Sequence, residues 1–459
     1  MKLKQVKKKE LITIVTTKKI IMKKILLLLN TILLVAGVSN AQETVYPAKS
    51  QKGLVFIKNG TVHVGNGTVI ENATIKINNG KIEEVGTNIA IPQGDAQVLD
   101  ATGKHVYPGL ILPGSNLGLQ EISGVRATTD FNEIGEMNPS IRSIAAYNAD
   151  SKITNTLRSN GILLAHTAPV GALLAGQSSV VQLDAWHWED AAYKMDNGMH
   201  LYLPSLLGRP GGRLGALFAQ FMPQAPTDPL KAALERIEIV KNYFREAKVY
   251  IENTPKEINL KLEAARSLFE KKQKLFLHGN QVKQMLLAID FVKEFGFDVV
   301  IVGGSESWQI ANLLKQHNIS VVLSQMHDLP TLDDDDIDMP YKAPAVLQKA
   351  GVLFCINDDD PQNRGRNLAF NAGTAAAYGL TKEEALSAIT LNAAKILGAD
   401  QMTGSIEKGK DANIIISTGD ILDMHTSIVE HAFIQGRKIV LDDKHKQLYE
   451  RYKYKYAIK

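Results

Sequence analysis

The sequence predicts an α/β protein in which a helix-covered parallel sheet is joined to a small β-sandwich formed by both ends of the chain. The prediction depends on a change of pattern along the sequence. Between residues 109 and 397, short apolar runs alternate with segments of helical periodicity, which is typical of parallel strands with crossover helices. Residues 53–107 and 413–441 instead repeat β-branched runs separated by turns. Two such segments form one small domain when the intervening chain closes on itself.

The first 41 residues have the layout of a secretory signal peptide. A basic region follows Met22, an apolar run extends over residues 25–35, and Ser39-Asn40-Ala41 is a small-residue cleavage site. The apolar run is short for a bilayer span, and a membrane anchor is the alternative interpretation. Met22 is the better start for such a signal, so residues 1–21 are interpreted as a consequence of start-codon choice.

Removal of the leader changes the charge balance. The whole sequence has a formal net charge of +4, but residues 1–41 hold nine Lys and one Glu, which leaves 43 basic and 47 acidic residues. The resulting net charge of −4 gives no electrostatic support for nucleic-acid binding. Cys355 is the single cysteine, so an intrachain disulfide is excluded and a buried structural thiol is expected. Export without disulfides suits a periplasmic protein.

Strand and turn signals fill the two end segments. Asn59-Gly60 and Asn78-Asn79-Gly80 each stand between β-branched runs, and Asn-Gly pairs at such positions are characteristic of hairpins. Residues 413–417, 427–434 and 438–441 repeat this character near the C-terminus. We therefore expect the two ends to share a sheet or a core.

Helices and buried strands alternate in the middle of the chain. Residues 229–244 carry apolar side chains at helical spacing, namely Leu230, Leu234, Ile237 and Val240. Candidate strands follow over residues 275–277, 299–302, 321–323 and 352–356, and a helical pattern covers residues 281–295 between the first two. In a parallel barrel, chemistry gathers at the C-terminal ends of the strands. The residues that end these strands are therefore the candidates for a functional site.

Two motifs at opposite ends of this pattern resemble those of the amidohydrolase superfamily. Residues 390–423 read TLNAAKILGADQMTGSIEKGKDANIIISTGDILD, with the form T-x-N-x-A-x-x-L-G followed by G-S-x-E-x-G-K-D-A. Residues 80–86 read GKIEEVG, and VLDA, GK and VYPGL follow between residues 98 and 110. The resemblance extends from about residue 53 to residue 441, and it is to the imidazolonepropionase-like branch found among secreted bacterial members.

This resemblance implies a TIM-type (β/α)8 barrel over residues 109–397. Residues 42–108 and 398–441 are then the two parts of the β-sandwich, and residues 442–459 form a basic C-terminal tail that we expect to be a frayed terminus. The resemblance also implies hydrolysis of carbon–nitrogen bonds other than peptide bonds, by metal-activated water that attacks a carbonyl or amidine carbon.

The resemblance assigns two roles at the ends of the predicted strands. His278 ends strand five and matches a metal ligand of the family, as an imidazole suits a divalent metal. Asp358 follows strand eight and matches the aspartate that binds the metal and takes a proton from the attacking water. The residues alone leave two alternatives open, which are a hydrogen-bonded His278 without metal and a turn or helix cap at Asp358.

Other ligand positions depart from the family pattern. The family has His-x-His after the motif that ends at Leu110, whereas residues 111–116 read ILPGSN, and Gly304 stands where a second barrel histidine is usual. The expected cofactor is a divalent metal, zinc in the first place, with a reduced set of ligands. Further pocket candidates are His166, Glu306 and His327, with a helix cap as the alternative for Glu306. Candidates for binding a substrate carboxylate are Arg126, Arg142, Arg364 and Arg366.

Two functions of different class follow from this pattern. One is a hydrolase with a single weakly coordinated metal or an altered mechanism. The other is a catalytically inactive descendant that uses the fold as a periplasmic binding or scaffold protein, because function depends on the site rather than on the fold. In either case we expect a small-molecule substrate or ligand, no nucleic acid and no stable membrane anchor. General symmetry preferences favour a homodimer.

Overall fold

The computed structural model describes residues 22–24, 45–94, 96–122, 124–206, 228–253, 257–324, 326–330, 335–358 and 364–458. Residues 47–459 form one compact unit, and residues 1–46 form a separate one. The predicted signal peptide lies almost entirely outside the described residues. No helix within the described ranges combines the length and apolarity that crossing a membrane requires.

Both chain ends contribute strands to one sheet, as predicted from their turn patterns. Its strands are β1 (Leu54–His63), β2 (Val69–Asn78), β3 (Lys81–Gly86), β4 (Gln97–Asp100), β5 (His105–Pro108), β14 (Ile414–Ser417), β15 (Val429–Ile434) and β16 (Arg437–Lys438). The order is β16-β15-β14-β5-β1-β2-β3, and β4 pairs with β1. The antiparallel pairing of β5 with β14 joins the two chain ends, with Tyr107 opposite Ile415. A small hydrophobic core is formed mainly by these strands and includes Ile75 and Phe433.

The second sheet contains eight strands in the order in which they follow along the chain. They are β6 (Leu110–Ser115), β7 (Ile162–Thr167), β8 (Leu174–Gln182), β9 (Ala192–Tyr202), β10 (Lys274–Gly279), β11 (Val299–Gly303), β12 (Ser320–Leu323) and β13 (Phe354–Ile356). The four strands expected from the middle of the sequence are thus confirmed as β10 to β13. The sheet curves towards a barrel, and β13 and β6 are not paired among the described residues.

One strand departs from the parallel barrel that was expected. β8 runs antiparallel to both β7 and β9, whereas the pairs from β9 to β13 are all parallel. Only residues 168–173 connect β7 to β8. A parallel crossover needs about a dozen residues or more, so this short connection forces the chain to reverse. The connection from β8 to β9 is also short and contains the four-residue helix α3 (Trp188–Ala191).

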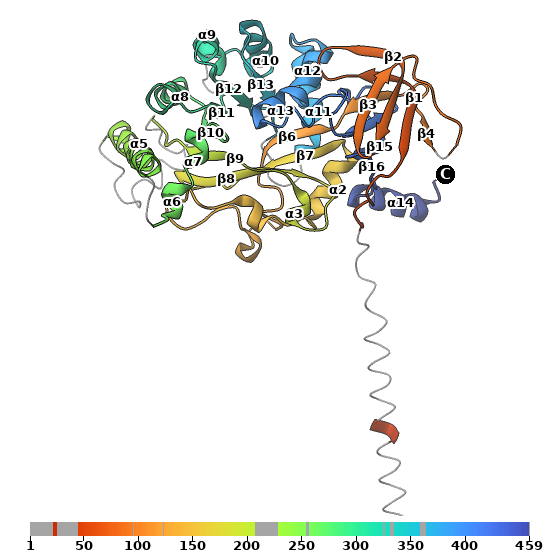
Figure 1. Ribbon diagram of the computed structural model, residues 1–459, viewed down its shortest axis with the longest axis horizontal. Coiled ribbons are helices and arrows are strands. Elements are labelled where there is room, and N and C mark those ends of the chain that lie inside the picture. The colour runs from red at the N-terminus through yellow and green to blue at the C-terminus, as the bar shows by residue number, and fades with distance from the viewer. Residues whose placement is uncertain are drawn as a thin grey trace, which may run out of the picture. The chain divides into compact units, whose positions relative to one another are not determined.

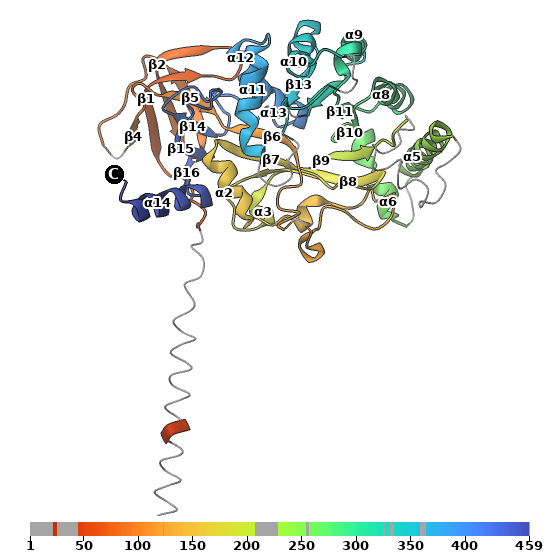
Figure 2. The same cartoon turned by 180° about the vertical axis from the view of Figure 1, so that it is seen from behind.

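Helices pack on the barrel sheet (Figures 1 and 2), and their buried side chains join the hydrophobic core of its strands. They are α2 (Lys152–Ser159), α5 (Pro229–Glu252), α6 (Leu260–Glu263), α7 (Arg266–Phe269), α8 (Val282–Phe295), α9 (Ala311–Gln316), α10 (Met339–Ala350), α11 (Leu368–Ala377), α12 (Lys382–Ala388) and α13 (Leu391–Leu397). In α5, Ile237, Val240 and Phe244 are buried, while Leu230 and Leu234 are exposed. The predicted helix over residues 281–295 corresponds to α8.

The C-terminal tail is a helix rather than the frayed terminus that was expected. α14 covers Lys444–Tyr456, and the side chain of its N-cap residue Asp443 accepts hydrogen bonds from the backbone N–H groups of His445 and Lys446. Ala457 ends the helix in the left-handed conformation. The composition of the segment suggested fraying, but a side-chain cap at one end and a regular stop at the other define a helix.

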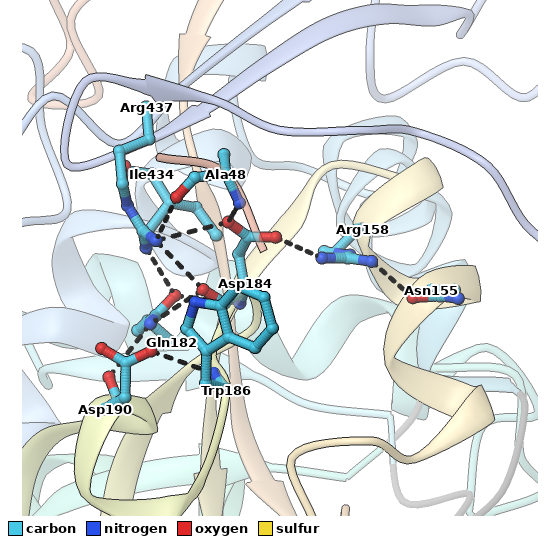
Figure 3. A network of polar contacts seen from close by, with 9 residues as sticks. All are labelled: Ala48, Asn155, Arg158, Gln182, Asp184, Trp186, Asp190, Ile434 and Arg437. Atoms are coloured by element: carbon cyan, nitrogen blue, oxygen red, sulfur yellow. Dashed lines mark hydrogen bonds and ion pairs between the residues drawn. The ribbon is translucent and has the colours of Figure 1, made fainter. Parts of the chain in front are cut away.

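A buried carboxylate links the two sheets (Figure 3). Asp184, just after β8, is 1% exposed and pairs with Arg158 of α2 at 2.6 Å. Its second oxygen lies 3.4 Å from Arg437 of β16 and accepts a hydrogen bond from the backbone N–H of Ala48. Gln182 completes the network by accepting from Arg437 and from the backbone N–H of Asp184. A helix of the barrel, a strand of the β-domain and the start of the compact unit therefore meet at one side chain.

We expect Asp184→Asn to lower the free energy of unfolding by about 3–5 kcal/mol, since removal of one partner leaves Arg158 charged and buried. Arg236→Gln is the control, because it breaks an exposed ion pair with Glu136 and should cost at most about 1 kcal/mol. Denaturant unfolding of both variants measures the difference. Equal losses of stability would show that the network contributes no more than a surface pair.

Candidate functional site

A cavity of about 590 Å³ opens at the carboxyl ends of the barrel strands. Residues that follow or end β6, β9, β10, β11, β12 and β13 all contribute to its wall. The apolar part of the wall includes Phe131, Val170, Leu203, Phe276 and Val302. The uncharged polar part consists of Ser115, Asn116, Gln120, Asn280, Gln284, Ser324 and Asn357, together with Tyr202, His200 and His278.

Two histidines stand in direct contact at this wall. Nδ1 of His200, on β9, lies 2.8 Å from Nε2 of His278, on β10. The parallel pairing of β9 with β10 places His278 opposite Tyr202, and the ring of Tyr202 stacks on His278 with centroids 3.8 Å apart. The two imidazoles therefore share one hydrogen bond and are held in place by an aromatic neighbour.

Phe276 supports the histidine pair from within the barrel. Its ring stacks on His200 with centroids 5.0 Å apart and an interplanar angle of 7°. Gly198 makes room for this ring, because a Cβ atom there would lie 2.4 Å from Phe276. A glycine in β9 thus fixes the depth at which His200 stands in the barrel.

Burial keeps these histidines neutral. Desolvation is the main cause that lowers the pKa of His200 well below its ordinary value, and the neighbouring His278 and His166 lower it further. The pKa of His278 is also lowered, first by desolvation and then by His166. His278 borders the cavity and is partly exposed, so water in the cavity moderates the effect on this residue. Near neutral pH both rings are therefore uncharged, and each has one nitrogen that can accept a hydrogen bond.

Two buried polar atoms beside the cavity have no partner among the described residues. They are Nε2 of His200 and Oδ1 of Asn116, and both residues belong to the cavity wall. A buried polar atom without a hydrogen bond costs about 1–3 kcal/mol. Such atoms mark places where water or a ligand supplies the missing partner.

His166 lies behind the cavity and not in its wall. Its ring is fully buried; Nδ1 lies 3.0 Å from the carbonyl oxygen of Pro113, and Nε2 lies 2.7 Å from Oγ of Ser178. The carbonyl oxygen can only accept, so Nδ1 carries a hydrogen, and Nε2 contacts both the Ser178 hydroxyl and Oδ1 of Asn197. Burial lowers the pKa of His166 to about 4. Its nitrogens are engaged in fixing the end of β6, which leaves none for a ligand.

The other residues proposed from the sequence have separate places. Asp358 is buried and accepts a hydrogen bond from Nδ2 of Asn371, and it is not among the residues of the cavity wall, where its neighbour Asn357 stands. Oε2 of Glu306 accepts from the backbone N–H of Val282, so this side chain caps α8 rather than the helix that follows it. Nε2 of His327 contacts Oγ1 of Thr374 at the surface.

The arginines considered for carboxylate binding are engaged elsewhere or stand apart from the cavity. Arg142 pairs with Asp196, and Arg366 donates to His445. Arg126 is exposed, and the side chain of Arg364 lies outside the described residues. Among the described residues of the cavity wall there is no Lys, Arg, Asp or Glu.

The described donors do not fit the metal centre that the sequence suggested. No group of three or more His, Cys, Asp or Glu side chains is placed to hold a metal ion within the described ranges. Two imidazole nitrogens on a tetrahedral zinc stand about 3.3 Å apart, given Zn–N bonds of about 2.0–2.1 Å. The 2.8 Å contact between His200 and His278 is shorter than this and corresponds to a hydrogen bond.

Sequence reasoning missed His200 because strand β9 was not recognised. Polar residues such as Lys194, Asp196 and Asn197 interrupt the apolar pattern of this strand. A usable signal was present in Met199-His200-Leu201, where a histidine stands between two apolar residues shortly before Pro204. The amide side chains of the wall had no comparable signal, because Asn and Gln at strand ends are common in turns.

A curved eight-stranded sheet with a polar cavity at its carboxyl ends, attached to a sheet from both chain ends, defines an amidohydrolase-type fold. Residues 256–439 match the model of the Amidohydrolase family. The solved structure of an amidohydrolase from Thermotoga maritima MSB8 superimposes with a TM-score of 0.72 and 27% identity, over 84% of this chain and 99% of that one. The partial match to the family model and this structural likeness support a relationship to the amidohydrolase superfamily.

The similar curated proteins include imidazolonepropionases. The chain is 27% identical to an imidazolonepropionase of Thermoplasma volcanium over 368 residues, which cover 76% of this chain and 84% of that protein. It is 24% identical to an imidazolonepropionase of a Geobacillus strain over 413 residues, or 83% and 90% of the two chains. The family and these relatives support a hydrolase that acts on carbon–nitrogen bonds.

The buried histidines make the fold sensitive to acid. A histidine of the unfolded chain titrates near pH 6.5, whereas burial lowers the pKa of His166 to about 4. Between these values the unfolded chain binds more protons, so the free energy of unfolding falls as the pH is lowered from about 6.5 to about 4. We expect His166→Gln to make this dependence shallower, even if the variant is less stable throughout.

Denaturant unfolding at a series of pH values measures the slope. His425→Gln is the control, because His425 is exposed and its removal should leave the slope unchanged. A slope that is the same in His166→Gln and in the wild type would show that His166 does not contribute to acid sensitivity.

Proposed function

We propose that this protein hydrolyses a carbon–nitrogen bond in a small uncharged molecule, and that the molecule binds in the cavity at the carboxyl ends of the barrel strands. The unpartnered Nε2 of His200 beside this cavity is the observation that carries the proposal. This nitrogen lacks a hydrogen-bonding partner among the described residues. A substrate or an attacking water can supply that partner.

The wall of the cavity supports the choice of an uncharged substrate. Its described polar residues are amides, hydroxyls and neutral imidazoles, and none offers a counter-charge to a carboxylate or an ammonium group. Transfer of an unpaired ion into such a cavity is costly. Amide side chains both donate and accept hydrogen bonds, so Asn116, Asn280 and Asn357 are suited to an amide, a lactam or a urea-like group.

The histidine pair is suited to moving a proton. Hydrolysis of an amide-like bond requires a group that takes a proton from water and a group that returns it to the leaving nitrogen. His200 and His278 are neutral near pH 7 and share one hydrogen bond, so a proton taken up by one ring can pass through this contact to the other. The unpartnered Oδ1 of Asn116 can accept a hydrogen bond from an N–H group of a bound substrate.

Amidohydrolases are generally metal-dependent, and the residues of this chain do not reproduce that centre as they are placed here. No step of the proposed reaction is therefore assigned to a metal. The alternative function, a binding protein on the same fold, would use the same cavity without turnover.

We expect His200→Gln and His278→Gln each to lower kcat by about 100-fold or more, since general acid–base groups contribute about 10²–10⁴. The measurement is turnover of a panel of neutral amides, lactams and ureas by the purified protein, with its metal content determined beforehand. His327→Gln is the matched control, because His327 lies outside the cavity wall and its loss should leave kcat unchanged.

Two results would contradict this account in different ways. Activity that survives in both variants, or that is lost on chelation of a bound metal, would remove the histidine pair from the mechanism. Binding of neutral ligands without turnover of any of them would favour the binding protein.

We also propose that the protein is exported and acts in the periplasm, as the pattern of residues 22–41 suggests. N-terminal sequencing of the protein from its native host should give a mature chain that begins near Gln42. Recovery of a soluble chain that begins at Met1 or Met22 would rule out this processing.

A further inference from the structure

We propose that α14 is a peripheral docking element that binds the surface of an anionic lipid bilayer. The helix projects beside α2 and β16 at the edge of the molecule (Figures 1 and 2). None of its thirteen residues is buried. This use of the helix is independent of the catalytic proposal, because α14 contributes nothing to the cavity wall.

Among the described residues, the side-chain hydrogen bond that joins α14 to the body of the protein lies in its first turn. Arg366 donates a hydrogen bond to Nε2 of His445, and Asp443 caps the first backbone N–H groups. From Tyr449 onward the side chains are mostly exposed, and Tyr454 is 91% exposed. An isolated helix of this length is marginal in water, so a surface that covers its second half would stabilise it.

The charge of the helix is opposite to that of the rest of the protein. Residues 444–459 contain six Lys or Arg and one Glu, a net charge of +5. Residues 42–443 contain 37 Lys or Arg and 46 Asp or Glu, a net charge of −9. A negatively charged surface would therefore repel the body and attract the helix, which selects one orientation of approach.

The aromatic residues of the helix suit the interfacial region of a bilayer. Tyr449, Tyr452 and Tyr456 are spaced three and four residues apart, so they share one face, and each is more than half exposed. Lys453 lies over the ring of Tyr449, and Lys455 lies over the rings of Tyr452 and Tyr456. Tyrosine rings and basic side chains together are enriched where a helix lies at a membrane surface.

The charge and the rings decide between an anionic bilayer and a nucleic acid as the partner. A polyanion needs the positive charges but gains less from four exposed tyrosines on a single short helix. A bilayer uses both, because the rings enter the headgroup region while the basic groups contact lipid phosphates. The proposal therefore commits to a lipid surface.

The test is co-sedimentation of the protein, with its native N-terminus, with two kinds of vesicle. One kind contains phosphatidylcholine alone, and the other contains phosphatidylcholine mixed with phosphatidylglycerol. We expect binding to the anionic vesicles that weakens at high salt. The double variant Arg451→Gln with Lys455→Gln removes two positive charges. It should weaken binding to the anionic vesicles roughly 30-fold, since each charge contributes about 1 kcal/mol.

A matched variant controls for net charge. Lys231→Gln and Lys283→Gln remove the same number of charges from exposed positions in the first turns of α5 and α8, and we expect their effect to be below twofold. A third variant, Tyr452→Ser with Tyr456→Ser, keeps the charge and should still lose binding several-fold. Circular dichroism of all variants checks that the fold is retained.

Three outcomes would overturn the proposal. The first is equal binding to both kinds of vesicle. The second is an equal loss of vesicle binding in the α14 charge variant and in the matched Lys231 and Lys283 variant. The third is binding to a nucleic acid without binding to anionic vesicles. Unchanged binding in the tyrosine variant would reduce the interaction to charge alone and would equally contradict the interfacial geometry.

Discussion

A buried carboxylate is a central contact in the placement of the β-domain on the barrel. The β-domain is made from both ends of the compact unit, so its position is fixed only where those ends contact the barrel. Asp184 provides such a contact, because it pairs with Arg158 of the barrel and with Arg437 of the β-domain. A buried ion pair contributes little net stability compared with apolar packing, but it is strongly sensitive to geometry. Its partners in the barrel and in the β-domain are all satisfied in this arrangement.

The network around Asp184 is connected through strand β8 to the strands that carry the buried histidines. Asp184 follows β8, whose antiparallel course between β7 and β9 is forced by two short connections. β7 carries His166, which fixes the end of β6 through the carbonyl oxygen of Pro113, and β9 carries His200. The strand that ends at the interdomain network is therefore the strand that lies between two of the buried histidines. An error in its register would move both of them.

Much of the fold could be predicted from the sequence because its signals are local. The strands from β10 to β13 are short apolar runs with helices between them, and the turn at Asn78-Asn79-Gly80 joins β2 to β3 as predicted. The hairpin predicted at Asn59-Gly60 is wrong, because these residues lie within β1 at an irregularity of its register. The direction of β8 could not be predicted, because hydrophobic periodicity does not specify strand direction. His278 was identified as the end of a clear strand, whereas His200 stands in a strand whose polar residues conceal it. The environment of Asp358 depends on which way a side chain points after a three-residue strand, and sequence spacing does not determine this.

The end of β6 brings small and neutral residues to the cavity. Gly114, Ser115 and Asn116 all border it. The backbone N–H of Gly114 donates to Oδ1 of Asn357 at 3.1 Å, and a Cβ atom at Gly114 would lie 3.0 Å from Nδ2 of the same side chain. Glycine therefore allows an amide from β13 to approach the end of β6 closely. Neutral hydrogen-bonding groups and the histidine pair thus stand together in one wall. Such a wall selects for an uncharged ligand, whether or not that ligand is turned over.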